Sequence, residues 1–132
     1  MIKLFIGGKG SGKTKALIEL VNNAANTTAG SVVCIEKGSK LKLDITYKAR
    51  LINSDDYAIN GADALYGFIS GILASNSDIT DIFVDGTLKI CASAEDLGKV
   101  LAELEKICGN VNLVMTASIA VEDCPDSVKK YA

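Results

Sequence analysis

The chain has 132 residues, 48% of them hydrophobic and 23% charged, a balance typical of a globular core, so residues 1–132 are expected to form a single domain. The net charge of −2 argues against general nucleic-acid binding, because no basic stretch could neutralise several phosphates. No apolar run reaches the ~20 residues of a membrane span and no signal-peptide pattern is present, so we expect a cytoplasmic protein.

The first predicted elements surround a glycine-rich loop. Residues 2–6 form an apolar run typical of a strand, and a helical pattern extends from residue 14 to about residue 25. Between them, residues 7–14 read Gly-Gly-Lys-Gly-Ser-Gly-Lys-Thr, a complete match to the phosphate-binding pattern G-x-x-x-x-G-K-T. The strand–loop–helix context is the one that this motif requires.

The loop predicts a site for a nucleoside triphosphate with Mg²⁺. Glycines allow backbone N–H groups to approach the phosphates closely, and the helix that follows directs its positive end to the same place. Lys13 is expected to reach the β- and γ-phosphates and to assist catalysis, and the Thr14 hydroxyl to bind Mg²⁺. ATP is favoured over GTP, because no guanine-reading motif is visible. The candidate nucleotide-binding residues are Gly7, Gly8, Lys9, Gly10, Ser11, Gly12, Lys13 and Thr14.

The middle of the chain continues the alternation of strands and helices. Residues 31–36 form a predicted strand rich in β-branched residues, and residues 37–40 interrupt it. Residues 41–47 alternate apolar and polar side chains, which indicates an edge strand or one arm of a hairpin. Residues 49–53 resemble a short strand, and a helix is expected from residue 60 or 61 to about residue 74.

The last third repeats the pattern. Residues 81–85 form a predicted buried strand, and Ser93 resembles the N-cap of a helix, which Gly109 would end. Residues 110–116 form the last predicted strand, followed by a turn or short helix in the tail. Strands separated by helices indicate a three-layer α/β/α fold, with a mainly parallel sheet of about five strands.

Acidic and hydroxyl side chains end three of these strands. Ligands of parallel sheets bind at the carboxyl ends of the strands, so we expect Glu36, Asp85 and Thr116 to gather beside the phosphate loop. Asp85 is a candidate Mg²⁺ ligand of the Walker-B type, and the alternative is an acid that caps a turn before Gly86. Glu36 is a candidate catalytic residue that orients or deprotonates the attacking water, and the alternative is a solvated strand end.

Other polar residues bear on function less directly. The hydroxyl groups of Thr116 and Ser118 could sense the γ-phosphate or simply bond their own backbone. Arg50 is the only arginine, so a kinase site that grips two phosphate groups with several arginines is disfavoured. Arg50 could instead reach across a subunit boundary as an arginine finger, or it could be an ordinary surface residue.

The cysteines suggest neither zinc binding nor a disulfide framework. The chain has no histidine, its four cysteines show no C-x-x-C spacing, and the domain is large enough to form a core without cross-links. We therefore expect no zinc site, and Cys34 is expected to be a small core residue. The four positions are Cys34, Cys91, Cys108 and Cys124.

The order of these features resembles the RecA-like core of the additional-strand phosphate-loop NTPases, especially the twitching-motility (PilT-type) and type II/IV secretion ATPases. Residues 33–37, Val-Cys-Ile-Glu-Lys, occupy the place of that family's acidic box, Thr-Ile-Glu-Asp-Pro. Residues 51–54, 80–86 and 113–118 resemble its next strand, its Walker-B strand and the strand before its histidine box. The chain has no histidine, and of the acidic box it keeps only Glu36. RecA-type recombinases and type II thymidine kinases share much of the same order.

These features leave three functions open. The resemblance implies an ATPase, slow alone and stimulated by self-association or by a protein partner. The missing histidine and the single arginine favour a nucleotide-binding switch or accessory module with little turnover. A small-molecule or nucleoside kinase is the third alternative.

Overall fold

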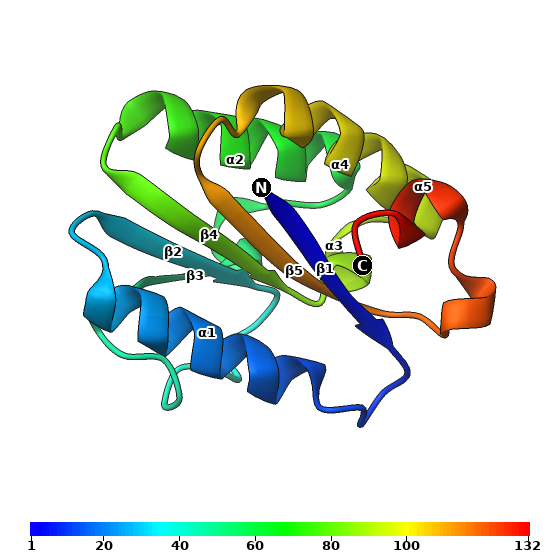
Figure 1. The fold of residues 1–132 in the computed structure, drawn as a ribbon, viewed down its shortest axis with the longest axis horizontal. Helices are drawn as coiled ribbons and strands as arrows, with labels where there is room; N and C mark the ends of the chain where they lie inside the picture. Colours follow the sequence, from blue (N-terminus) through cyan, green and yellow to red (C-terminus); the bar gives the residue numbers. More distant parts are fainter.

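A computed structural model describes residues 1–132 as a parallel β-sheet with helices on both faces (Figure 1). Every strand pairing is parallel, and the strand order is β1-β5-β4-β2-β3. The strands are β1 (Ile2–Gly7), β2 (Ser31–Glu36), β3 (Arg50–Asn53), β4 (Ile79–Asp85) and β5 (Asn112–Ser118). The expected α/β/α class and five-stranded sheet are confirmed.

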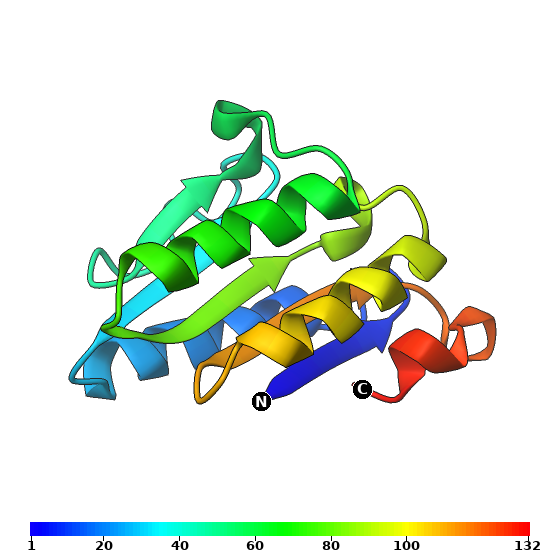
Figure 2. The same ribbon diagram turned by 90° about the horizontal axis from the view of Figure 1, so that it is seen from above.

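The helices divide between the two faces of the sheet. Helix α1 lies alone on one face, whereas α2 and α4 lie side by side on the other, with the short α5 beside α4 (Figures 1 and 2). No helix combines the length and the apolar character needed to cross a membrane. The helices are α1 (Lys13–Thr27), α2 (Ala62–Ser75), α3 (Thr87–Ile90), α4 (Ala94–Ile107) and α5 (Asp126–Lys129), with two 3-10 turns, η1 (Ser54–Tyr57) and η2 (Val121–Asp123).

The central strands β2, β4 and β5 are buried on both faces of the sheet, which explains why each contains a continuous apolar run. Strand β4 shows the division, because Ile82 and Val84 join the core under α2 and α4 while Phe83 joins the core under α1. Leu17 and Val21 of α1 are fully buried in that second core. The two layers of side chains fix the sheet rigidly between the helices.

The strand order separates β1 from β4 by one strand, β5. The phosphate-loop motif follows β1 and Asp85 ends β4, so both lie at the carboxyl edge of the sheet. This parallel arrangement is compatible with a phosphate-loop, RecA-like core. Several local expectations also hold: Ser93 accepts a hydrogen bond from the N–H of Asp96 at 3.2 Å as the N-cap of α4, and Gly109 has a φ of +55° just after α4.

The expectation of a strand or hairpin arm at residues 41–47 is wrong. These residues form turns, with the N–H groups of Asp44 and Ile45 both donating to the carbonyl of Leu41. Leu41, Ile45 and Ala49 recur every fourth residue and pack in the core under α1, whereas Leu43 is 96% exposed. The spacing that matters is therefore four residues, and the alternation suggested by Leu43 has no counterpart in the packing.

Candidate functional site

The loop between β1 and α1 presents free backbone donors at one point. Gly12 precedes α1 with a φ of +86° and Gly10 has a φ of +80°, a conformation that glycine adopts without strain. The N–H groups of Gly10, Gly12, Lys13 and Thr14 donate no hydrogen bond within the protein. No side chain caps α1, and its first turn carries no acid. The resulting cluster of donors at the positive end of a 15-residue helix suits an anion.

A cavity of about 350 Å³ lies in front of these donors. Its lining contains four lysines and no acid. The Nζ atom of Lys13 lies within the loop, 2.9 Å from the carbonyl oxygen of Gly8 and 3.3 Å from Oγ of Ser11. The lining residues are Lys9, Gly10, Gly12, Lys13, Thr14, Lys15, Lys89 and Ser118. The cavity is therefore cationic as well as rich in N–H donors.

Three polar side chains from different elements meet beside this cavity. The Thr14 hydroxyl donates to the carboxylate of Asp85, with its Oγ1 3.2 Å from Oδ1 and 3.4 Å from Oδ2. The Thr116 hydroxyl donates to Oδ1 of Asp85 at 2.8 Å and accepts from the N–H of Gly86, also at 2.8 Å. Thr14 and Asp85 thus bring together hard oxygen donors of the kind that Mg²⁺ prefers.

Thr116 is not placed to contact a ligand directly. Its side chain is 2% exposed, and its hydroxyl already makes both of the bonds described above. Thr116 therefore fixes the carboxylate of Asp85 relative to the backbone of Gly86. Ser118, two residues further on, is exposed and borders the cavity.

Glu36 lies beside Asp85 in the sheet, as the two are register partners in β2 and β4. The side chain is only 3% exposed, and its two carboxylate oxygens accept hydrogen bonds from the N–H groups of Lys40 at 3.1 Å and Leu41 at 3.0 Å. Burial raises the pKa of the Glu36 carboxyl, the two N–H bonds lower it in part, and the negative charge of Asp85 raises it further. The carboxylate thus holds the segment after β2, and the catalytic role stays a prediction.

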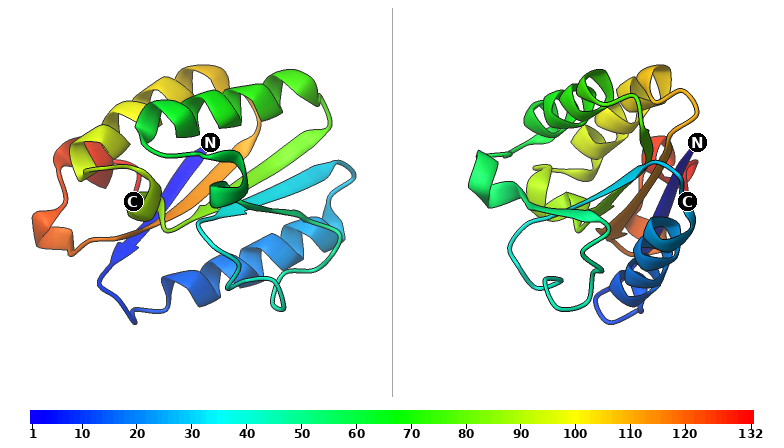
Figure 3. Two further views of the ribbon diagram at one scale, coloured as in Figure 1. Left: turned by 180° about the vertical axis from the view of Figure 1, so that it is seen from behind. Right: turned by 90° about the vertical axis from the view of Figure 1, so that its left-hand side faces the viewer.

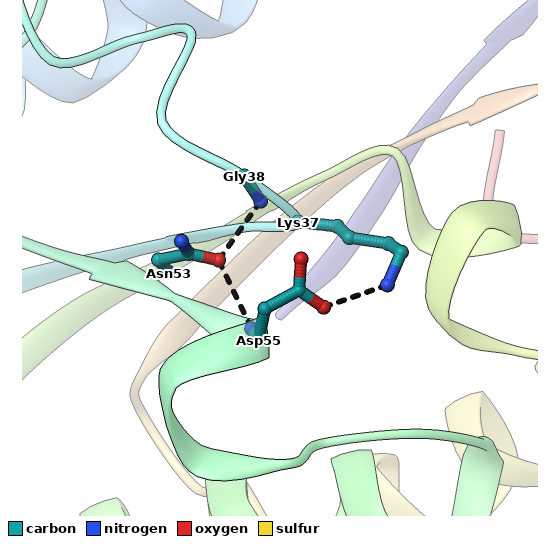
Figure 4. A network of polar contacts seen from close by, with 4 residues as sticks. All are labelled: Lys37, Gly38, Asn53 and Asp55. Atoms are coloured by element: carbon teal, nitrogen blue, oxygen red, sulfur yellow. Dashed lines mark hydrogen bonds and ion pairs between the residues drawn. The ribbon is translucent and has the colours of Figure 1, made fainter.

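The ends of β2 and β3 are tied together by a small polar network (Figure 4). Asn53 Oδ1 accepts from the N–H groups of Gly38 at 2.9 Å and Asp55 at 3.0 Å, and Lys37 forms an ion pair with Asp55 at 2.7 Å. Arg50 is exposed at the beginning of β3, the edge strand, three residues before its carboxyl end. Nothing in the chain brings Arg50 to the lysine-lined cavity.

A second cavity, of about 440 Å³, lies between residues 38–49 and the β3–η1 region, which are near one another in Figure 3. Its walls contain two acids, Glu36 and Asp56, and one lysine, Lys42. It is the larger of the two, but this mixed lining offers no concentration of anion donors. The chemistry of phosphate binding therefore favours the smaller cavity beside the loop.

Lys89 is a residue of the candidate site that the sequence analysis did not identify. It belongs to α3, a single turn between β4 and α4 that was not predicted, and it borders the cavity together with Lys9 and Ser118. The only feature of the sequence that could have pointed to Lys89 is its position four residues after Asp85.

No protein-family model matches the sequence, and no curated protein is significantly similar to it.

Proposed function

We propose that this protein binds a nucleoside triphosphate, with ATP favoured, together with Mg²⁺, at the loop of residues 7–14. The observation that carries the proposal is the hydrogen bond between Thr14 and Asp85, which joins a helix terminus rich in free N–H groups to an acid at the end of another strand. The expected roles follow from the chemistry of these groups. Backbone N–H groups and Lys13 bind phosphate oxygens, while Thr14 and Asp85 would hold the metal.

The donor set fits Mg²⁺ because it consists of a hydroxyl and a carboxylate, with Thr116 fixing the carboxylate. When bound, Mg²⁺ would offset negative charge on the phosphates. The remaining work falls to this chain: the N–H groups orient the phosphates, and Lys13 compensates their charge.

Hydrolysis is proposed to be slow, because the acid suggested as its catalyst is already occupied. Both oxygens of Glu36 accept backbone hydrogen bonds in a buried setting, so activating a water would require the contacts with Lys40 and Leu41 to change. A second copy of the chain or a protein partner could complete the site. The same observation favours the alternative of a nucleotide-binding switch with little turnover. The exposed position of Arg50 offers no support for a kinase.

Calorimetric titration with MgATP tests the binding proposal. Wild-type protein is expected to bind, and Lys13→Ala is expected to lose most of the affinity, because a cation close to the phosphates is removed. Lys99→Ala is the matched control, since Lys99 is exposed on α4 and outside the cavity. Equal binding by the wild type and Lys13→Ala would refute the assignment.

Phosphate release then separates the enzyme from the switch. The rate is measured over a range of protein concentrations, with Lys13→Ala as the blank. A rate per molecule that increases with concentration indicates sites completed between subunits, and Arg50→Ala would then be tested. Tight binding without release above the blank indicates the switch.

A further inference from the structure

Lys89 is held on a rigid support at the edge of the cavity. The Thr87 hydroxyl donates to the carbonyl of Thr116 at 2.8 Å, and the N–H of Lys89 donates to the carbonyl of Gly86 at 2.9 Å. Thr87 is fully buried and Ile90 is 5% exposed, so the turn is fixed on both sides of the lysine. The backbone of α3 is therefore anchored while the Lys89 side chain remains exposed.

The side chain of Lys89 runs along the backbone that follows Asp85. A Cβ atom built on Gly86 would lie 3.2 Å from Cδ of Lys89, so the stem packs directly over this glycine. The positive charge also extends towards Glu36, whose pKa it lowers slightly against the larger effect of burial. The Lys89 stem thus covers the residue that directly follows Asp85, while its charge borders the cavity.

Lys89 makes no ion pair in the protein. The two ion pairs of the chain are Lys37–Asp55 and Lys106–Glu103, both away from this cavity. An unpaired cation on a fixed turn, in a cavity also lined by three other lysines, gains from an anionic ligand and loses no existing ion pair when the ligand binds. Lys9, by comparison, lies on the glycine-rich loop itself, and Arg50 lies at the beginning of β3.

We propose that Lys89 binds the terminal phosphate of the nucleotide and makes the site prefer a triphosphate to a diphosphate. This inference rests on the proposed function. Thr14 and Asp85 would hold a metal near the terminal phosphates, and Lys89 lies on the turn that directly follows Asp85 and Gly86. Its charge is therefore placed towards the terminal phosphate, whereas the loop N–H groups would bind the phosphates nearer the nucleoside. Lys89 supplies from α3 the cation that an arginine would otherwise provide.

The test compares affinities for MgATP and MgADP by calorimetry in wild type, Lys89→Ala, Lys89→Arg and the control Lys99→Ala. Lys89→Ala is expected to weaken MgATP binding about tenfold, the loss of one charge-assisted hydrogen bond, and to change MgADP binding less than about twofold. Lys89→Arg is expected to retain the preference for ATP, because it keeps the charge. Thermal melting of each variant confirms that it folds.

The results that would overturn the role of Lys89 differ from those that would overturn the nucleotide site. Equal losses of MgATP and MgADP affinity in Lys89→Ala, or no loss of either, would overturn the role of Lys89 while leaving the nucleotide site intact. Wild-type protein that binds neither nucleotide, or binding that does not depend on Lys13, would reject the nucleotide site and the role of Lys89 together.

Discussion

Replacement of Glu36 by alanine removes the acceptor of two backbone hydrogen bonds. The N–H of Leu41 is left buried without a partner, which costs about 1–3 kcal/mol, while the N–H of exposed Lys40 can turn to water and loses about 0.5–1.5 kcal/mol. Removal of a buried carboxylate offsets part of this cost. We therefore expect a net loss of about 2–3 kcal/mol in the free energy of unfolding, a large share of the 5–15 kcal/mol of a typical domain.

Urea denaturation measures this loss, and the midpoint is expected to fall by about 1 M with an m value in the usual range. Hydrogen exchange at the amide of Leu41 gives the local signal, because its protection should disappear before that of the strands. Glu19→Ala, an exposed change on α1, serves as the control and should alter stability by less than about 0.5 kcal/mol. A loss in Glu36→Ala no larger than that of the control would show that the carboxylate does not hold residues 40 and 41.

The pH dependence of the same pair of proteins provides an independent check. The pKa of Glu36 is raised in the folded state, chiefly by burial, so the folded protein binds this proton more tightly than the unfolded chain does. Stability from this source is present below the ordinary carboxyl pKa of about 4.3, and is lost as the pH rises through the higher folded value. The advantage of wild type over Glu36→Ala should therefore be larger at acidic pH than at neutral pH.

Three further predictions concern other parts of the fold. Thr116→Val removes the hydroxyl that donates to Asp85 and accepts from the N–H of Gly86, so it should lower the unfolding free energy by about 1–3 kcal/mol and weaken the Mg²⁺ dependence of nucleotide binding. Unchanged stability and unchanged Mg²⁺ dependence would show that Thr116 does not position Asp85. Gly30→Ala places a Cβ against the carbonyl oxygen of Asp78, so it should lower the unfolding free energy by about 1–3 kcal/mol in thermal melts. Gly67→Ala on the exposed face of α2 meets nothing within 4 Å and should be neutral or stabilising, and equal effects of the two changes would argue against the close approach at Gly30. All four cysteines are buried, and burial raises the pKa of the Cys34 thiol to about 12 and that of Cys91 to about 11. A thiol reagent at pH 8 should therefore react fast only after denaturation, and rapid labelling of the native protein would contradict this prediction.

The sequence was sufficient where local pattern and tertiary packing agree. The runs at residues 32–35 of β2 and 82–84 of β4 are continuously apolar, as strands buried on both faces require, so their pattern differs from that of a surface helix. Ser93 and Gly109 set the ends of α4 by local backbone chemistry. The meeting of Thr14, Asp85 and Thr116 followed from topology alone, because parallel strands end at one edge.

The sequence was insufficient where long-range contacts decide. Residues 41–47 are fixed by Glu36 and by Asn22 of α1, whose side chain bonds the carbonyl of Asp44 and the N–H of Thr46. Neither contact leaves a local signal, so the alternation of apolar residues dominated the prediction. The turn that carries Lys89 is four residues long and is held by Thr116, which lies on another strand. Such a short helix has no periodicity that sequence could reveal.

The placement of β1 has a consequence for how the protein is made. Of the five strands, β1 is synthesised first, yet its only neighbour in the sheet is β5, the strand synthesised last. The carbonyl of Met1 accepts from the N–H of Leu113, and the N–H of Leu4 donates to the carbonyl of Tyr131. Residues 1–4 are therefore held by residues more than a hundred positions later in the sequence. The candidate site therefore cannot assemble until Thr116 has been synthesised, and the glycine-rich loop stays without its sheet until β5 is available to pair with β1.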